Sequence, residues 1–211
     1  MNNIVIVSYN CDELGNYFQL CNADLQQYII DTSLSIAVHC EHNNCDREIL
    51  HDKLKEFDDD YIVSIYAHGE EENYIKRTKN RIRTNKNEDL INIENAMHSY
   101  TNAIVYSTSC YAANELGETM HLYGCKLFFG YKAKSYLSLL YKDDFIEMDN
   151  FTLKLILDAE IIDGRELYKK TNKFLTDKIK EMRTKNPLVA PLIIHNREAF
   201  TIYHNKIVYP N

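Results

Sequence analysis

Two apolar stretches decide the fold, YIVSIYA at residues 61–67 and AIVYST at residues 103–108. Both are short, rich in β-branched and aromatic residues, and bounded by polar segments, which is typical of buried strands in a parallel sheet. The first stretch is followed directly by His68, and the second ends two residues before Cys110. If the two strands are neighbours, His68 and Cys110 emerge together at the carboxyl edge of the sheet, where open α/β sheets place their ligands.

The rest of the chain alternates between strand-like and helix-like segments. We expect further strands at residues 4–9, 33–39, 126–130, 192–195 and 200–203, and helices at residues 16–30, 46–57 (capped by Asn44), 89–99, 137–157 and 165–183, with one more helix directly after Cys110. Residues 70–83 are expected to form a loop or a short hairpin. This alternation predicts an α/β fold, a three-layer sandwich with a mostly parallel central sheet flanked by helices, in one domain over residues 1–211.

The composition limits the classes of function. The chain has 211 residues, 45% of them hydrophobic, which is enough for one substantial core. Its net charge of −7 does not favour direct binding of nucleic acid. Neither a signal peptide nor a membrane-spanning stretch is recognisable, so we expect a cytoplasmic protein without a membrane partner. The six cysteines are then expected to be reduced thiols.

The candidate catalytic residues are Cys110 and His68. A thiol beside an imidazole is a nucleophile with its base, and the N-terminus of the helix expected after Cys110 would favour the thiolate. His68 would protonate the leaving amine. Gly69 has no side chain, so its backbone N–H can approach a substrate carbonyl closely and, with the N–H of Cys110, form an oxyanion hole.

These motifs resemble those of the caspase-like (clan CD) cysteine peptidases, a group that includes caspases, metacaspases, legumain, gingipains, separase and the bacterial CHAT proteins. The motifs here are IYAHG at residues 65–69 and YSTSC at residues 106–110, about 40 residues apart with one expected helix between them. Residues 116–131, where a strand ends in Gly-Tyr, are similar to the segment after the family's cysteine. Residues 191–196 are similar to the closing strand of CHAT domains, the nearest members of the group.

The resemblance implies a caspase-like fold with a dyad in which Cys110 is the nucleophile and His68 the acid and base, without a metal or other cofactor. It also implies a protein substrate and a role in regulated proteolysis, which for CHAT proteins is often defence against phage. Because a chain of this length leaves little room for a separate sensor domain, we expect control by an activating partner, a processing event or an upstream protease. Thr108 stands where metacaspases have an acidic residue that holds a basic substrate side chain. An uncharged residue before the cleaved bond is therefore as compatible with the sequence as a charged one.

Two other clusters of residues have functional alternatives. His39, Cys40, Cys45 and His51 suggest zinc, but their spacing departs from that of structural sites, so we expect a polar loop and no metal. The basic run at residues 76–83 suggests an acidic partner, nucleic acid or a self-processing site, and a solvated loop is the favoured interpretation.

Three hypotheses for the function follow from the sequence. The first is a cysteine endopeptidase, and the second is a non-catalytic CHAT-like module that binds or regulates a partner. The third is another cysteine hydrolase such as a glutaminase, which ranks last because the Gly-x-Cys-x-Gly elbow is missing around Cys110.

Overall fold

A computed structural model describes residues 3–9, 13–32, 34–41, 47–57, 59–74, 77–83, 89–158, 163–204 and 207–209. The main sheet consists of β1 (Asn3–Ser8), β2 (Ile36–Glu41), β3 (Tyr61–Tyr66), β7 (Ala103–Ser107), β8 (Leu127–Tyr131), β9 (Phe200–His204) and β10 (Ile207–Tyr209). Its seven strands lie in the order β10-β9-β8-β7-β3-β1-β2. The run from β2 to β8 is parallel, and β9 and β10 extend it with antiparallel pairings. The predicted, mostly parallel sheet is confirmed.

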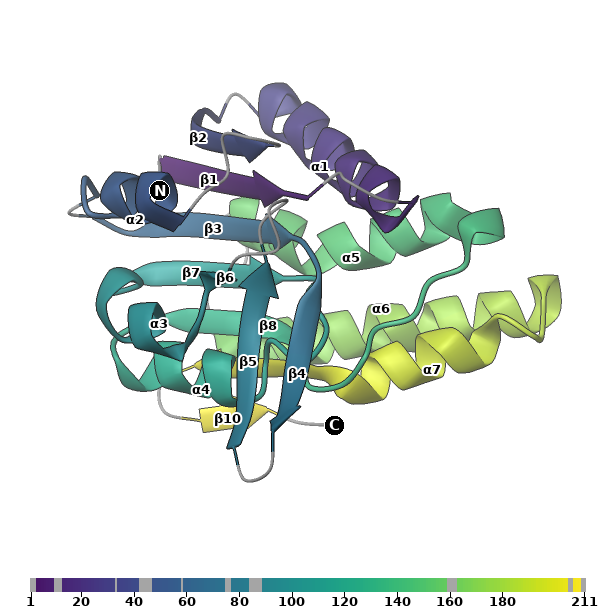
Figure 1. The fold of residues 1–211 in the computed structure, drawn as a ribbon. Coiled ribbons are helices and arrows are strands. Elements are labelled where there is room, and N and C mark those ends of the chain that lie inside the picture. The colour runs from purple at the N-terminus through teal and green to yellow at the C-terminus, as the bar shows by residue number, and fades with distance from the viewer. Residues whose placement is uncertain are drawn as a thin grey trace.

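Helices cover both faces of this sheet (Figure 1). They are α1 (Glu13–Asp31), α2 (Arg47–Leu54), α3 (Ile93–Ser99), α4 (Glu115–Leu122), α5 (Lys142–Leu157), α6 (Gly164–Lys185) and α7 (Ala190–Ala199), with a short 3-10 turn at Leu139–Tyr141. Successive side chains of a strand point to opposite faces, so Ile4 and Ile6 pack under α1, α5, α6 and α7, while Val5 and Val7 pack under α2, α3 and α4. The molecule is the predicted three-layer α/β sandwich.

A second, three-stranded antiparallel sheet begins directly after His68. It contains β4 (Gly69–Tyr74), β5 (Arg77–Arg83) and β6 (Asp89–Ile91), and in Figure 1 its hairpin runs across the strands of the main sheet. Of the two expectations for residues 70–83, the hairpin is therefore correct. The helix expected from residue 89 begins at Ile93, because Asn92 caps it by accepting a hydrogen bond from the Asn95 N–H.

The expected helix directly after Cys110 is wrong. Residues 109–114 form turns, and α4 begins only at Glu115. Tyr111 has a left-handed backbone (φ 60°), which ends any helical path. Its N–H donates to Ala133 O (3.2 Å), and the Ala113 N–H donates to Tyr131 O (3.0 Å), so these donors bond to the end of β8 and to the segment that follows it. The thiol of Cys110 therefore does not lie at a helix N-terminus.

The strand expected at residues 192–195 is also wrong, because these residues lie within α7. Pro191 occupies the first turn, where its missing N–H costs nothing, and Ala190, Ile193 and Asn196 are buried at helical spacing. A short apolar run cannot be assigned to strand or helix by periodicity alone. The similarity of residues 191–196 to a closing strand is lost, and β9 begins only at Phe200. The expected cap, Asn44, lies outside the described residues.

The order of the strands reverses at β1, which has β2 on one side and β3 on the other. Helices α1 and α2, which follow β1 and β2, pack on opposite faces of the sheet. In open α/β sheets such a reversal opens a crevice outside the carboxyl ends of the strands, and ligands bind there. The fold thus points to the edge where β1, β3, β7 and β8 end.

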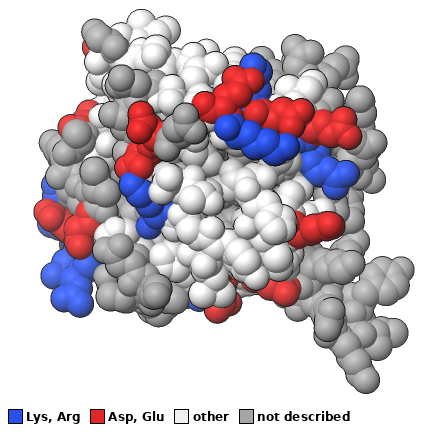
Figure 2. Space-filling model, turned by 90° about the vertical axis from the view of Figure 1, so that its left-hand side faces the viewer, with Lys and Arg blue, Asp and Glu red and all other residues white. Residues whose placement is uncertain are grey.

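The opposite edge carries mixed charges. Figure 2 shows acidic and basic side chains interspersed around a broad uncharged area on that side of the molecule. Ion pairs there join Lys55 to Asp52 on α2 and Lys126, which precedes β8, to Asp60, which precedes β3. Within the described part of the chain, no helix is both long and apolar enough to cross a membrane.

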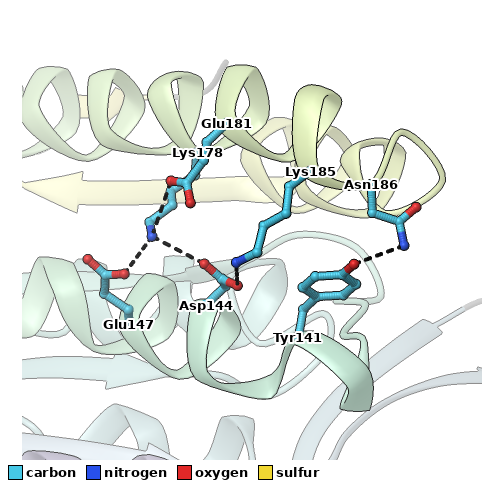
Figure 3. Close-up of polar contacts among 7 residues, drawn as sticks. All are labelled: Tyr141, Asp144, Glu147, Lys178, Glu181, Lys185 and Asn186. Carbon is cyan, nitrogen blue, oxygen red and sulfur yellow. Dashed lines mark hydrogen bonds and ion pairs between the residues drawn. The ribbon is translucent and has the colours of Figure 1, made fainter.

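Helix α5 is held against α6 by a cluster of charges (Figure 3). Lys178 Nζ lies 2.6 Å from Glu147 and 3.4 Å from Asp144, and Lys185 Nζ lies 3.0 Å from Asp144. Burial alone would lower the pKa of Lys178, but the hydrogen bond to Glu147 and the nearby carboxylates outweigh it, so the pKa is raised. These contacts fix α5, whose other side faces the carboxyl edge of the sheet.

Candidate active site

The ends of β3 and β7 are tied together, as the sequence predicts for neighbouring strands. Ile65 pairs with Ser107 in the parallel register, and the Thr108 N–H donates to Ile65 O (3.0 Å). Beyond the last paired residues, the Ser109 hydroxyl donates to Ala67 O (2.8 Å). The residues that follow each strand, His68 and Cys110, are thereby held at the same edge.

Gly69 lies directly against the backbone of Cys110. A Cβ atom at residue 69 would stand 2.0 Å from Cys110 O and 2.9 Å from Cys110 N, which is too close for any side chain. This contact is a structural reason for glycine at position 69. It adds to the reason expected from the sequence, which is that the Gly69 N–H can approach a substrate carbonyl closely. The two amide groups expected to form the oxyanion hole belong to backbone segments that touch.

A pocket of about 690 Å³ opens at this edge. Its walls come from α1, the ends of β3 and β7, the segment after β8, and the helices α5 and α7. The lining residues include Leu14, Tyr17, Phe18, His68, Gly69, Thr108, Cys110, Tyr111, Lys134, Ser135, Tyr136, Leu137, Asp149 and Asn196. Its volume is within the range of small-molecule and peptide side-chain sites, and it contains both members of the predicted dyad.

The imidazole of His68 packs between two aromatic rings. The Tyr9 ring lies edge-on at 5.0 Å between centroids, and the Phe18 ring lies edge-on at 5.4 Å. Edge-to-face contacts of this kind are favourable and fix the plane of the ring. Tyr9 follows β1 and Phe18 belongs to α1, so the first crossover of the fold orients the histidine.

Cys110 is the accessible thiol of the described part of the chain. Cys21, Cys40 and Cys125 are buried, whereas Cys110 is half-buried at the pocket. Burial raises the pKa of Cys125 to about 12 and that of Cys21 well above its usual value, so these two thiols are unreactive. Cys11 and Cys45 lie outside the described residues.

A serine that the sequence did not single out contacts the thiol of Cys110. Ser135 Oγ lies 3.7 Å from Cys110 Sγ and donates to Thr108 O (3.4 Å). The hydroxyl therefore bridges the thiol and the residue two positions before it. Ser135 follows β8, which lies beside β7 in the sheet. The position after a neighbouring strand is the only sequence signal that could have identified Ser135 as part of the site.

An acidic side chain, Asp149 of α5, also lines the pocket. Its two carboxylate oxygens accept hydrogen bonds from the hydroxyls of Tyr17 (2.6 Å) and Tyr131 (2.8 Å). Burial raises the pKa of Asp149 to about 6, against the two hydrogen bonds, which act to lower it. The carboxylate is mostly enclosed yet keeps part of its surface open to the pocket.

The residues considered for zinc take other roles. His39 Nε2 lies 3.0 Å from the Asn22 amide, and His51 Nε2 lies 3.3 Å from Leu90 O, while Cys40 is buried beside β1. Cys45 is outside the described residues. In the part of the chain that the structure describes, no three His, Cys, Asp or Glu side chains come together in a way that would hold a metal ion.

Comparison with known proteins gives no further assignment. No model of a protein family matches the sequence, and no curated protein matches it either. The functional argument therefore depends on the fold and on the residues of the pocket.

Proposed function

We propose that the protein is a caspase-like cysteine endopeptidase with Cys110 as the nucleophile and His68 as the acid and base. One observation carries the proposal. The two residues follow adjacent parallel strands, and both line the same pocket of about 690 Å³ at the carboxyl edge of the sheet. A nucleophile and a base that share a cavity at this edge are what acyl-transfer chemistry requires.

The reaction would proceed through a thioester. The Cys110 thiolate attacks the carbonyl carbon of the scissile peptide bond, and the carbonyl oxygen takes up the negative charge. Collapse of this intermediate breaks the C–N bond, and the His68 imidazolium gives its proton to the leaving amine. His68 then removes a proton from water, which attacks the thioester, and the Cys110 sulfur leaves as the free thiol.

The oxyanion would be stabilised by the backbone N–H groups of Gly69 and Cys110. Donors fixed in place before the reaction stabilise developing charge without reorganisation, which makes such a hole one of the largest contributions to catalysis. The close contact of Gly69 with Cys110 supports this role, because it holds the two amides in one small region.

The biological setting that we propose is regulated proteolysis of a protein substrate in the cytoplasm, as in bacterial defence against phage. A reducing compartment keeps the Cys110 thiol available for attack. Control would come from an activating partner or an upstream protease. The mixed charges of the opposite edge, where basic and acidic side chains alternate, do not favour nucleic acid as a direct partner there.

Covalent labelling tests the proposal. We would treat the protein with peptidyl acyloxymethyl ketones that differ in the residue before the electrophile, and locate the adduct by intact mass and peptide mapping. We expect selective modification of Cys110 in the wild type and its loss in His68→Ala. The exposed histidine of α3 supplies the matched control, since His98→Ala removes an imidazole outside the pocket.

The outcomes separate the three hypotheses. Labelling of Cys110 that depends on His68, with cleavage of a protein substrate lost in Cys110→Ala, supports the endopeptidase. Hydrolysis of glutamine without cleavage of peptide bonds would indicate the amidase alternative. Absence of labelling, also in the presence of candidate activators, would contradict the dyad and favour a non-catalytic binding module.

A further inference from the structure

We propose that Asp149 makes the pocket a site for a guanidinium or ammonium side chain, namely the arginine or lysine on the N-terminal side of the cleaved bond. The inference rests on the proposed function for the role of the bound residue as part of a substrate. The cation selectivity of the pocket itself follows from the surroundings of Asp149.

Among the residues that the structure describes, no basic side chain pairs with the carboxylate of Asp149. Its contacts in the described structure are the hydroxyls of Tyr17 and Tyr131, one on each oxygen, and no described Lys, Arg or His forms an ion pair with it. A carboxylate has about four acceptor positions, so the two tyrosines leave about half of them for another donor. Enclosed charges in proteins are normally paired, and a cationic ligand would supply the missing pair.

The neighbours of Asp149 on α5 have full sets of partners, which makes Asp149 the exception. Asn150 accepts from the Tyr66 hydroxyl (2.6 Å), and its amide donates to Cys21 O (2.8 Å) and to Asp24 (2.7 Å). Asp144 is paired with Lys178 and Lys185. Both residues stabilise the packing of helices, whereas Asp149 faces the pocket with its negative charge uncompensated.

The pocket connects Asp149 to the nucleophile. Both residues line the same cavity. The lining of this cavity also includes the apolar side chains of Leu14, Phe18 and Leu137. Such a wall suits the aliphatic stem of arginine or lysine, with the charged end at the carboxylate.

One cationic residue, Lys134, belongs to the pocket lining but does not neutralise Asp149. It is exposed, and its Nζ lies 5.8 Å from the centroid of the Tyr136 ring, so the group sits at the solvent-facing rim. Thr108, which also lines the pocket, supplies no charge. Asp149 of α5, which follows β8 in the chain, therefore provides the negative charge that the position of Thr108 lacks.

Ligand binding tests the site without any need for turnover. We would titrate Cys110→Ala protein with Nα-acetyl-arginine methylamide and Nα-acetyl-norleucine methylamide, and follow binding by NMR chemical-shift changes. We expect at least tenfold tighter binding of the arginine compound in this background, and loss of that preference when Asp149→Asn is added. The matched control is Asp143→Asn, which removes an exposed carboxylate of the same helix outside the pocket. Equal binding of the two compounds, or a preference that persists in the Asp149 variant, would overturn the inference.

A second experiment separates this inference from the proposed function. In the wild type, peptidyl electrophiles with arginine, lysine, norleucine or aspartate before the reactive group are compared by their rates of Cys110 modification. Faster labelling by the arginine and lysine compounds, reduced at least tenfold by Asp149→Asn, supports both proposals. Labelling that depends on His68 but favours norleucine or aspartate overturns the inference and leaves the peptidase intact. Arginine binding that depends on Asp149, without any labelling of Cys110, would contradict the proposed peptidase activity and support the cation site. Iodoacetamide, which carries no such side chain, should modify the wild type and Asp149→Asn at similar rates.

Discussion

Asp149 occupies a position of α5 where the surrounding pattern calls for an apolar residue. Phe145 and Leu153, four residues before and after it, are both buried in the core. Because residues four apart share a helix face, Asp149 lies on the same apolar stripe. A carboxylate placed there is costly to the fold, and the cation site that we propose would give a functional reason for it.

The cost of Asp149 should appear as a pH-dependent difference in stability. Its pKa of about 6 in the folded protein lies above the usual value of 3.8, so folding takes up a proton between these pH values. The free energy of unfolding therefore falls as pH rises from 4 to 6, by about 3 kcal/mol from this group, and does not change further above that range. In Asp149→Asn this pH-dependent loss of stability is absent, because the amide does not titrate.

We expect Asp149→Asn to have nearly wild-type stability at pH 4 and to be more stable than the wild type at pH 7.5, measured by urea unfolding. The other titratable groups around the carboxylate are Tyr17, Cys21, Tyr66, Tyr106 and Tyr131, whose pKa values burial raises well above their ordinary values, so they do not titrate in this interval. A difference between variant and wild type that stays constant with pH would contradict the prediction.

Ser135 should influence the reactivity of Cys110. Its hydroxyl lies 3.7 Å from the sulfur and can turn to donate to a thiolate, which would stabilise the charged form. We expect Ser135→Ala to slow the alkylation of Cys110 by iodoacetamide at pH 7 by about threefold to tenfold, the worth of one ordinary hydrogen bond. Ser138→Ala, in the same segment but outside the pocket lining, is the control and should leave the rate unchanged.

At this scale the sequence predicts only part of the site. His68 and Cys110 could be found because each follows a strand-like run, and parallel strands end at one edge. Ser135 and Asp149 could not, because a loop and a distant helix bring them to that edge with no characteristic spacing. A polar residue on the apolar stripe of α5 was the available signal for Asp149, and Asn150 beside it shows that the same signal also marks structural residues.

At the scale of elements, the charge cluster between α5 and α6 should contribute measurably to stability. The side chain of Lys178 is only 13% exposed and forms ion pairs with both Asp144 and Glu147. We expect Lys178→Met to lower the free energy of unfolding by about 1–3 kcal/mol, because it removes the ion pair with Glu147 and leaves the largely enclosed Asp144 with Lys185 alone. Lys180→Met, which removes an exposed lysine paired within the same helix, should change it by less than about 0.5 kcal/mol. Equal effects of the two variants in urea unfolding would show that the cluster adds nothing.

The elements that the sequence predicted well are those with long or clear periodicity. Helix α6 was expected at residues 165–183 and spans Gly164–Lys185, since its apolar stripe repeats over many turns. The two elements whose type was predicted wrongly are short segments, and their conformation depends on contacts with distant parts of the chain. Tyr111 and Ala113 donate their N–H groups to Ala133 and Tyr131, at and just after the end of β8, and residues 192–195 join a helix that begins just before Pro191.

At the scale of the whole molecule, the two cores should unfold together. Strands β1, β3, β7 and β8 contribute alternate side chains to both clusters of buried residues, so neither cluster can melt while the other keeps its sheet. We expect one calorimetric transition whose enthalpy equals the van't Hoff enthalpy. Two resolved transitions would contradict the prediction of one domain over residues 1–211.

The layered architecture follows from the sequence because alternation of strand-like and helix-like segments leaves few other arrangements. The strand order does not follow from it. The sequence of residues 36–41 does not indicate that β2 lies on one side of β1 and β3 on the other. The position of each strand depends on the face of the sheet against which its crossover helix packs. The pocket lies beside this reversal, so its walls were harder to predict than its two central residues.

The contact between Gly69 and Cys110 links the backbone of Cys110 to strand β4. Gly69 is the first residue of β4, and no side chain separates its backbone from that of Cys110. Packed protein interiors transmit displacement because they have little free volume to absorb it. A molecule that binds the β4–β5 hairpin away from the pocket and displaces it would therefore also displace the backbone of Cys110.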